Sequence, residues 1–218
     1  MISVEQFLRF FWSQYLLIED DFLLTTKYVT LEDDNENAYS NEYAKILLET
    51  GSEVDVVCKE LCKLNDVKAN NIFDYGNNIN KVFSGFGDVT IDIKLTHTRL
   101  QPWISWSSEE LDSPEWWKAY NIIKHDRLGY DGKYNNWTLA NQKNTLNALA
   151  GLIQLECVLY SFLKENDDGK YSSTPLPGSK LFSSINGLYW NNDLLNGDYR
   201  YYIDKKGILV FESPLFYR

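Results

Sequence analysis

The segment from Thr138 to about Lys164 constrains the fold more than any other, because it is apolar on two sides of a single helix. One apolar stripe contains Leu149 and Ile153, and a second contains Leu155. A helix with one apolar face can lie at a surface, whereas one that is apolar on most of its circumference must be enclosed by other elements. We therefore predict a mainly α fold in which this helix is the centre of a bundle.

Apolar periodicity predicts four more helices before the central one. The first spans about 4–24, and the second begins at Ser40, a good N-cap residue, and continues to about residue 64. A shorter helix runs from about 72 to 85 or 87. The fourth covers about 116–127 and is preceded by Ser113, Pro114 and Glu115, which suit the N-cap, the first helical position and the positive helix end. The first 165 residues are therefore expected to form a helical bundle.

Two short β units interrupt and follow these helices. Residues 89–95 alternate between apolar and polar side chains, which predicts a half-buried strand, and residues 99–106 are its expected partner, at an edge because of Pro102. Near the C-terminus, the alternation at Tyr201 and Ile203 and a turn ending at Gly207 predict a hairpin. We predict a bundle over residues 1–165 with a strand insertion at about 88–106. Residues 166–218 are predicted to form a linker and a C-terminal β-hairpin appendage packed on the bundle.

Composition limits the partners and the location of the chain. No window approaches the ~18 consecutive apolar residues of a membrane span, and the N-terminus shows no secretory signal. The three cysteines lack framework spacing and are expected to be buried thiols, as in a reducing compartment. The net charge of −10 disfavours broad nucleic-acid binding but is compatible with a local basic cleft. We expect a soluble cytoplasmic protein without a membrane partner.

The predicted helix at 116–127 carries the residues best suited to chemistry. Lys118, Asn121 and His125 are separated by three and four positions and therefore share one helix face. An adjacent face carries three further polar residues, Tyr120, Lys124 and Arg127. A histidine titrates near neutral pH and can exchange a proton with a ribose 2′-hydroxyl or a leaving oxygen, while a nearby cation stabilises charge on a phosphate.

This pattern points to metal-independent RNA cleavage. His125 would be the acid or base, and Asn121 would hold the imidazole or bind a phosphate oxygen. Arg127 or Lys124 would supply the phosphate cation, and Lys118 and Tyr120 would complete the substrate-binding face. Two such helices facing each other in a dimer would supply acid, base and cations from symmetric copies.

The same stretch resembles a motif of the HEPN superfamily, small helical domains common in prokaryotic toxin and defence systems. The resemblance is carried by Asn121-Ile-Ile-Lys-His125, because in that family an arginine, often followed by a polar residue, lies four to six positions before a histidine on a long helix. It extends over about residues 7–163 and implies a helical bundle, homodimers along these helices and, in many members, RNase activity. Tyr120 stands where the family's arginine is expected, so a neighbouring lysine or Arg127 would have to supply the cation.

We expect a HEPN-like protein that acts on RNA as a metal-independent endoribonuclease of a toxin or defence system. Its expected partners are RNA or a nucleotide, a second copy of the chain, and an antitoxin or other defence protein. The alternative is a non-catalytic module that uses the same helix to bind a nucleotide or a protein. The absent arginine and the acidic net charge favour the alternative, whereas the shared face of Lys118, Asn121 and His125 favours the enzyme.

Other residues leave two interpretations open. Glu53 lies on or beside the apolar face of its helix, where a carboxylate normally has a partner. It would support His125 or Arg127, or it would form a structural ion pair between helices or reach water from an edge position. A histidine and an arginine near a helix C-terminus also simply complement the helix dipole. Two histidines, scattered cysteines and the lack of a glycine-rich phosphate loop predict neither a metal site nor a cofactor.

Overall fold

The computed structural model describes residues 2–64, 66–83, 85–96, 98–108, 110–164, 171–172, 174–187, 190–193, 200–203 and 209–212. The described elements are mainly α-helices, joined by a small antiparallel sheet and a separate two-stranded hairpin. This confirms the predicted fold class, mainly α with small β units.

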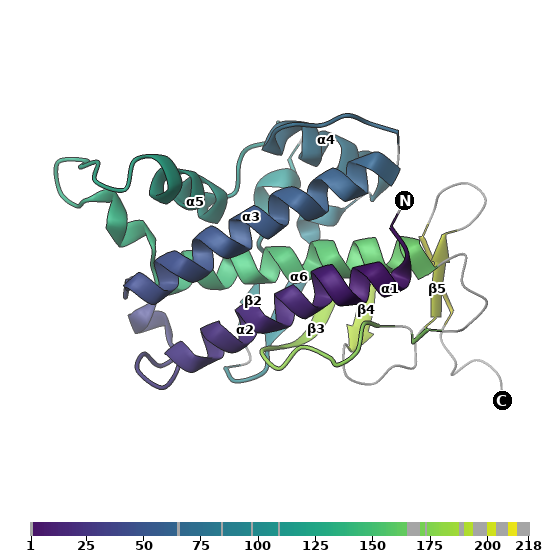
Figure 1. Ribbon diagram of the computed structural model, residues 1–218, viewed down its shortest axis with the longest axis horizontal. Helices are drawn as coiled ribbons and strands as arrows, with labels where there is room; N and C mark the ends of the chain where they lie inside the picture. The colour runs from purple at the N-terminus through teal and green to yellow at the C-terminus, as the bar shows by residue number, and fades with distance from the viewer. Residues whose placement is uncertain are drawn as a thin grey trace.

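The central helix is α6 (Gln142–Lys164), as predicted. It is long and apolar enough to cross a membrane by length and composition, but 89% of that stretch is buried inside the protein, as in the core helix of a soluble protein. The longest helix beside it, α3 (Asn41–Leu64), makes its most extensive contacts. Figure 1 shows α3 and the N-terminal helix crossing in front of α6.

The N-terminal helix is continuous over α1 (Val4–Phe7), a π-helical turn (Leu8–Trp12) and α2 (Ser13–Thr25). Two shorter helices follow α3, namely α4 (Ile72–Val82) and α5 (Glu115–His125). Short 3₁₀ turns occur between these helices, at Asp33–Asn35, Phe86–Asp88, Ile104–Trp106 and Asn136–Leu139. These bounds confirm the predicted helices to within a few residues. Helix α4 ends at Val82 rather than at residue 85 or 87, and α5 ends at His125, two residues earlier than predicted.

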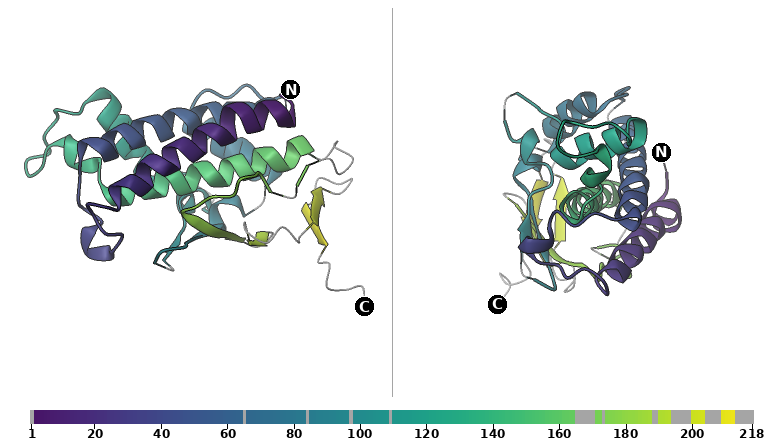
Figure 2. Two further views of the ribbon diagram at one scale, coloured as in Figure 1. Left: turned by 60° about the horizontal axis from the view of Figure 1, so that its bottom comes forward. Right: turned by 90° about the vertical axis from the view of Figure 1, so that its left-hand side faces the viewer.

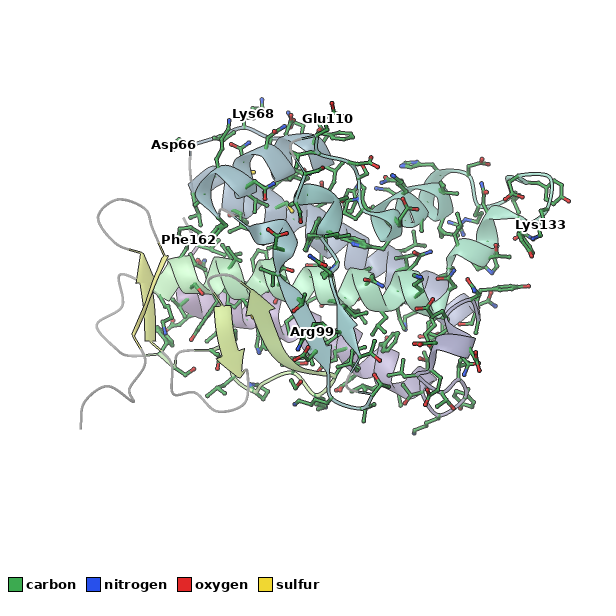
Figure 3. All side chains as sticks on the ribbon, turned by 180° about the vertical axis from the view of Figure 1, so that it is seen from behind. Asp66, Lys68, Arg99, Glu110, Lys133 and Phe162 are labelled. Atoms are coloured by element: carbon green, nitrogen blue, oxygen red, sulfur yellow. The ribbon has the colours of Figure 1, made fainter. Side chains whose placement is uncertain are left out.

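A four-stranded antiparallel sheet lies on the other side of α6, in front of it in the view of Figure 3. Its order is β2 (Arg99–Leu100), β1 (Thr90–Ile93), β3 (Phe182–Gly187) and β4 (Trp190–Asp193). The predicted pairing of residues 89–95 with 99–106 is confirmed, although the second strand is only two residues long and ends before Pro102.

The sheet crosses the predicted boundary at residue 165. Strand β3 comes from the segment predicted as linker and appendage, yet it pairs with β1, with Ile91 opposite Ile185. Leu181 and Phe182, just before and at the start of β3, are fully buried. The predicted C-terminal hairpin corresponds to β5 (Arg200–Ile203) and β6 (Leu209–Glu212), which pair antiparallel, while its predicted turn lies outside the described residues.

A buried carboxylate attaches the β3 segment to the N-terminal helix. Glu19 of α2 is fully buried and accepts hydrogen bonds from the Tyr15 hydroxyl at 2.6 Å and from the Ser179 hydroxyl. It also accepts from the backbone N–H groups of Lys180 at 2.8 Å and Leu181 at 3.2 Å. Burial and the adjacent Glu19 charge raise the pKa of Tyr15, so its hydroxyl stays a donor. Glu19 thus satisfies four donors from two distant parts of the chain.

A second buried carboxylate lacks such partners. Glu156 of α6 is fully buried, and neither of its carboxyl oxygens accepts a hydrogen bond from a described residue. Burial raises the pKa of Glu156 well above its usual value, and the negative charge of Glu53 on α3 raises it further. The hydroxyl of Thr50, one turn before Glu53, is also buried and has no hydrogen-bond partner among the described residues. Glu156 is therefore a buried carboxyl group at a place where an apolar side chain would fit the surroundings better.

We expect Glu19→Gln to lower the free energy of unfolding by about 2 to 4 kcal/mol, because an amide cannot accept from all four donors. Urea denaturation measures this loss. The matched control is Asp20→Asn, which removes only the exposed ion pair with Lys180 at 2.6 Å and should cost less than about 1 kcal/mol. Equal losses in the two variants would contradict the role assigned to Glu19.

We expect Glu156→Met to stabilise the protein by about 1 to 4 kcal/mol at pH 8, because a similar volume is filled without a buried acid. The pKa of Glu156 is raised in the folded state, so the folded protein loses stability when Glu156 has to ionise. This loss is absent below pH ~4.5 and grows as pH rises. The advantage of the variant, measured by urea denaturation across pH 4–8, should therefore grow with pH. Glu156→Gln, which cannot ionise, should show the same pH trend relative to the wild type; a pH-independent difference would refute the assignment.

Candidate functional site

Helix α5 is held in place by its aromatic side. Trp116 donates a hydrogen bond from Nε1 to the carbonyl of Pro102 at 2.8 Å, and its ring lies edge-on to Trp103 with centroids 5.0 Å apart. Trp117 and Ile123 are buried on the same side. Both tryptophans are therefore anchors of α5 in the core, which leaves the opposite face and the C-terminal end of the helix to carry any function.

Tyr120 occupies the position of the arginine expected from the HEPN resemblance, and it is buried against α3. A Cβ atom added to Gly51 would lie 2.4 Å from Tyr120 Cδ2, so only glycine allows the ring to pack here. Lys124, one turn later, donates from Nζ to the Tyr120 hydroxyl at 3.1 Å. Tyr120 thus belongs to the α3–α5 interface and supports Lys124, rather than projecting from the predicted substrate-binding face.

The predicted face of Lys118, Asn121 and His125 exists, but two of its members have local partners. Lys118 forms ion pairs with Asp112 at 2.8 Å and Glu115 at 3.0 Å. Asn121 donates from Nδ2 to the carbonyl of Trp117 on its own helix at 2.9 Å. The positive charge of Lys118 is therefore balanced, and no hydrogen bond joins Asn121 to His125.

His125 is the last residue of α5 and is exposed to solvent. Within the described part of the chain it has neither a hydrogen-bond nor an ion-pair partner. Arg127 lies beyond the end of the helix, where its guanidinium is 5.7 Å from the ring centroid of Trp137. The prediction that Arg127 continues the face of Tyr120 and Lys124 is corrected, because α5 ends before it.

Glu53 is not brought together with His125 or Arg127 by any hydrogen bond or ion pair. It is half-buried on α3, and burial followed by the charge of Glu49 raises its pKa. Glu53 in turn raises the pKa of Glu156. Its electrostatic neighbours are therefore carboxylates, and its partial exposure fits an edge position that reaches water.

The loop after α5 forms a projecting surface that the sequence interpretation missed. A bridge between Tyr130 and Asn135 closes the loop, and Asp131 accepts hydrogen bonds from the N–H groups of Lys133 and Tyr134 at 2.8 and 2.7 Å. These two hydrogen bonds lower the pKa of Asp131. The exposed rings of Tyr130 (67%) and Tyr134 (53%) lie on this loop, with the Lys133 Nζ 4.7 Å from the Tyr134 ring centroid.

The end of α5 and this loop together form what we call the α5-end surface: Lys124, His125, Arg127, Tyr130, Lys133 and Tyr134. It lies at one extremity of the molecule, where Figure 3 labels Lys133. The interleaving of cations with aromatic residues over positions 124–134 was the sequence signal that could have identified it.

The described cavities lie elsewhere. One of about 740 Å³ opens between the 31–36 segment, the β1–β2 end and the start of α6, and one of about 470 Å³ lies between the end of α2 and the start of α3. No residue of the α5-end surface lines either cavity. Among the described residues, no three histidine, cysteine, aspartate or glutamate side chains are placed to hold a metal ion.

We expect Gly51→Ala to lower the free energy of unfolding by about 1 to 3 kcal/mol, because the new methyl group overlaps the Tyr120 ring. This opposes the small stabilisation that alanine normally brings to a helix interior. Urea denaturation measures the change, with the exposed neighbour Ser52→Ala as control. In a Tyr120→Ala background the cost of Gly51→Ala should largely disappear; an unchanged cost would show that the ring is not its cause.

Comparison of the chain with protein-family models, with curated proteins and with solved structures finds no match. The resemblance to the HEPN superfamily therefore stays an expectation drawn from the sequence. Function has to be argued from the chemistry of the α5-end surface.

Proposed function

We propose that this protein binds single-stranded RNA with the α5-end surface and that His125 is the acid–base group for cleavage there. The observation that carries the proposal is a group of three cations, Lys124, Arg127 and Lys133, that form no ion pair among the described residues and lie next to exposed aromatic rings, in a chain whose net charge is −10. RNA recognition in single strands combines phosphate contacts to cations with stacking of bases on aromatic side chains.

The charges of this surface are arranged to leave the cations available. Asp131 is engaged by backbone N–H groups of its own loop, and Asp126 accepts from the Asn136 side chain. Within the described residues Lys124, Arg127 and Lys133 form no ion pair and contact a hydroxyl or an aromatic ring, although the charge of Lys133 also lowers the pKa of Asp131. Elsewhere in the described part of the chain many lysines are neutralised by carboxylates, as are Lys45, Lys59 and Lys143.

The aromatic rings suit single-stranded rather than duplex RNA. Tyr130 and Tyr134 expose most of their side chains on a projecting loop, and stacking of one base on an aromatic ring contributes about 1 to 3 kcal/mol. The acidic net charge of the chain does not prevent binding at this surface, because counterion release depends on the cations that contact the phosphates. Binding should therefore be weak in high salt and confined to this surface.

The chemistry available to His125 is transesterification. A neutral imidazole takes the proton from a ribose 2′-hydroxyl, and the 2′ oxygen attacks the adjacent phosphorus. The bond from phosphorus to the 5′ oxygen breaks, and that oxygen takes a proton from solvent, which leaves a 2′,3′-cyclic phosphate and a 5′-hydroxyl. Arg127 or Lys124 stabilises the negative charge that develops on the phosphate oxygens.

The second candidate function is RNA binding without cleavage. Burial of Tyr120 at the position of the expected arginine favours it, as does the neutralisation of Lys118 by two carboxylates. In that case the α5-end surface would hold RNA or a nucleotide, and His125 would only contact it. Both functions suit a cytoplasmic toxin or defence protein controlled by an antitoxin or another protein of the system.

We expect Lys124→Glu/Lys133→Glu to weaken binding of a fluorescently labelled single-stranded RNA at least tenfold, because two phosphate contacts become repulsive. Fluorescence anisotropy at low and moderate salt measures the affinity. The matched control is Lys68→Glu/Lys81→Glu, which changes the net charge equally at exposed positions away from this surface; Figure 3 labels Lys68. Equal weakening in the two variants, or no binding by the wild type, would refute the proposal.

His125→Ala separates the two candidate functions. For an endoribonuclease, the variant binds RNA within about threefold of the wild type but loses the release of 2′,3′-cyclic phosphate ends, analysed by gel electrophoresis. Binding without cleavage in both proteins would assign the non-catalytic function. Cleavage that persists in His125→Ala would show that another group moves the proton.

A further inference from the structure

The cavity of about 740 Å³ has an apolar floor. Leu31, Ile93 and Leu146 line it and are only 6%, 2% and 8% exposed, while Leu95, just after β1, also lines it and is 61% exposed. The left-hand view of Figure 2 shows the turn at Asp33–Asn35 and the end of the β1–β2 hairpin, both below α6. The volume of the cavity is within the ~300–1,000 Å³ that is usual for a site that binds a small molecule.

The rim of this cavity carries an excess of negative charge. Four lining residues are carboxylates, Glu32, Asp33, Asp34 and Glu36, and Lys143 is the one cation among the described residues that line it. Lys143 pairs with Glu36 at 3.0 Å. The other three carboxylates are exposed, and none of them forms an ion pair or a side-chain hydrogen bond within the described part of the chain. They are therefore available to a cation.

A buried amide adds a further acceptor to the cavity. Gln142 of α6 is part of the lining and only 3% exposed. Its Nε2 donates to the Thr30 carbonyl at 3.1 Å and to the Tyr43 hydroxyl at 3.2 Å, whereas its Oε1 accepts from no described residue. The Nδ2 of Asn147 is also used, because it donates to the Lys143 carbonyl at 2.9 Å. The amide atoms left for a ligand are thus oxygens, and a ligand that fits them must bring hydrogen-bond donors.

We propose that this cavity binds a linear aliphatic polyamine. Its ammonium groups would donate charge-assisted hydrogen bonds to the carboxylates of residues 32–34 and to Gln142 Oε1. The methylene segments between them would lie on Leu31, Ile93 and Leu146, as the stems of lysine side chains lie on apolar surface. Such a ligand matches both the apolar floor and the acidic rim.

Other classes of ligand match only part of this lining. Among the described residues, no three histidine, cysteine, aspartate or glutamate side chains are placed to hold a metal ion, so these carboxylates are not gathered around one divalent cation. An anionic ligand would be repelled by the rim. A purely apolar ligand would leave Gln142 Oε1 without a donor, which costs free energy at a buried position.

None of the residues that line the cavity belongs to the α5-end surface. Polyamine binding here and RNA binding there can therefore be tested separately, and either can fail without the other.

Isothermal titration calorimetry of the full chain with spermidine, a linear triamine, tests the proposal in ~150 mM salt, where distant exposed charges are screened. We expect one saturable site, and an affinity about tenfold or more lower in Asp33→Asn/Asp34→Asn, because two charge-assisted contacts are lost. The matched control is Asp66→Asn/Glu110→Gln, which changes the net charge equally at exposed positions that Figure 3 labels. It should bind like the wild type. Circular dichroism verifies that each variant is folded.

A second pair of variants tests the apolar floor. Leu95→Ser should weaken spermidine binding by about fivefold, because apolar contact with the methylene segments is lost. Leu128→Ser, at a residue that is 89% exposed and does not line the cavity, should have no effect. An unchanged affinity in Leu95→Ser would leave only ionic attraction and would overturn the assignment of the floor.

Three further outcomes would overturn the proposal. One is the absence of saturable spermidine binding by the wild type, and another is equal weakening in the two double variants. The third is displacement of spermidine by magnesium chloride at the same ionic strength, which would assign a divalent-cation site instead. If a lysine-rich peptide binds where spermidine does not, the cavity belongs to a basic protein partner and not to a polyamine.

Discussion

The enclosure of α6 is the constraint on which the rest of the structure depends. A helix with apolar side chains around most of its circumference has no stable place at a surface, because each exposed large apolar residue forgoes about 1.5 to 3 kcal/mol of burial. The N-terminal helix, α3 and α5 each contact α6, and the sheet lies on its remaining side. The sides of α6 are therefore covered by other elements. The α5-end surface projects from one extremity of the molecule, where loops leave the core.

Two buried glutamates show how the enclosure is completed and where it is imperfect. Glu19 receives four donors and so joins the β3 segment to α2, which brings residues about 160 positions apart into one buried network. Glu156 lies in the central helix itself and receives no hydrogen bond from the part of the chain that the structure describes. A buried carboxylate is stabilising only when the donors around it replace the lost hydration, and the difference between these two residues lies in their surroundings, not in their chemistry.

The same packing determines which residues are left to form the proposed RNA surface. The aromatic side of α5 is buried against α3 and α6, which turns Trp116, Trp117 and Tyr120 inward and removes them from any ligand. The helix then stops at His125, so that the following residues fold into a loop in which Asp131 accepts from backbone N–H groups, Asp126 accepts from Asn136, and Arg127 and Lys133 lie on aromatic rings without an ion pair among the described residues. A local positive site can thus exist in a strongly acidic protein, because charges are paired by tertiary neighbours and not by overall composition.

The sequence by itself determined the positions of the helices, the central place of α6, the alternating strand at β1 and the pairing of the C-terminal hairpin, because these follow from local periodicity. It also indicated His125 as an acid–base candidate at the end of a helix. Only the tertiary structure decided that β3 completes the sheet beside β1, that Glu19 meets Ser179, and that Tyr120 packs on Gly51. These contacts join residues between about 70 and 160 positions apart. No local pattern specifies them, because the free energy of such a contact depends on how whole elements pack around α6.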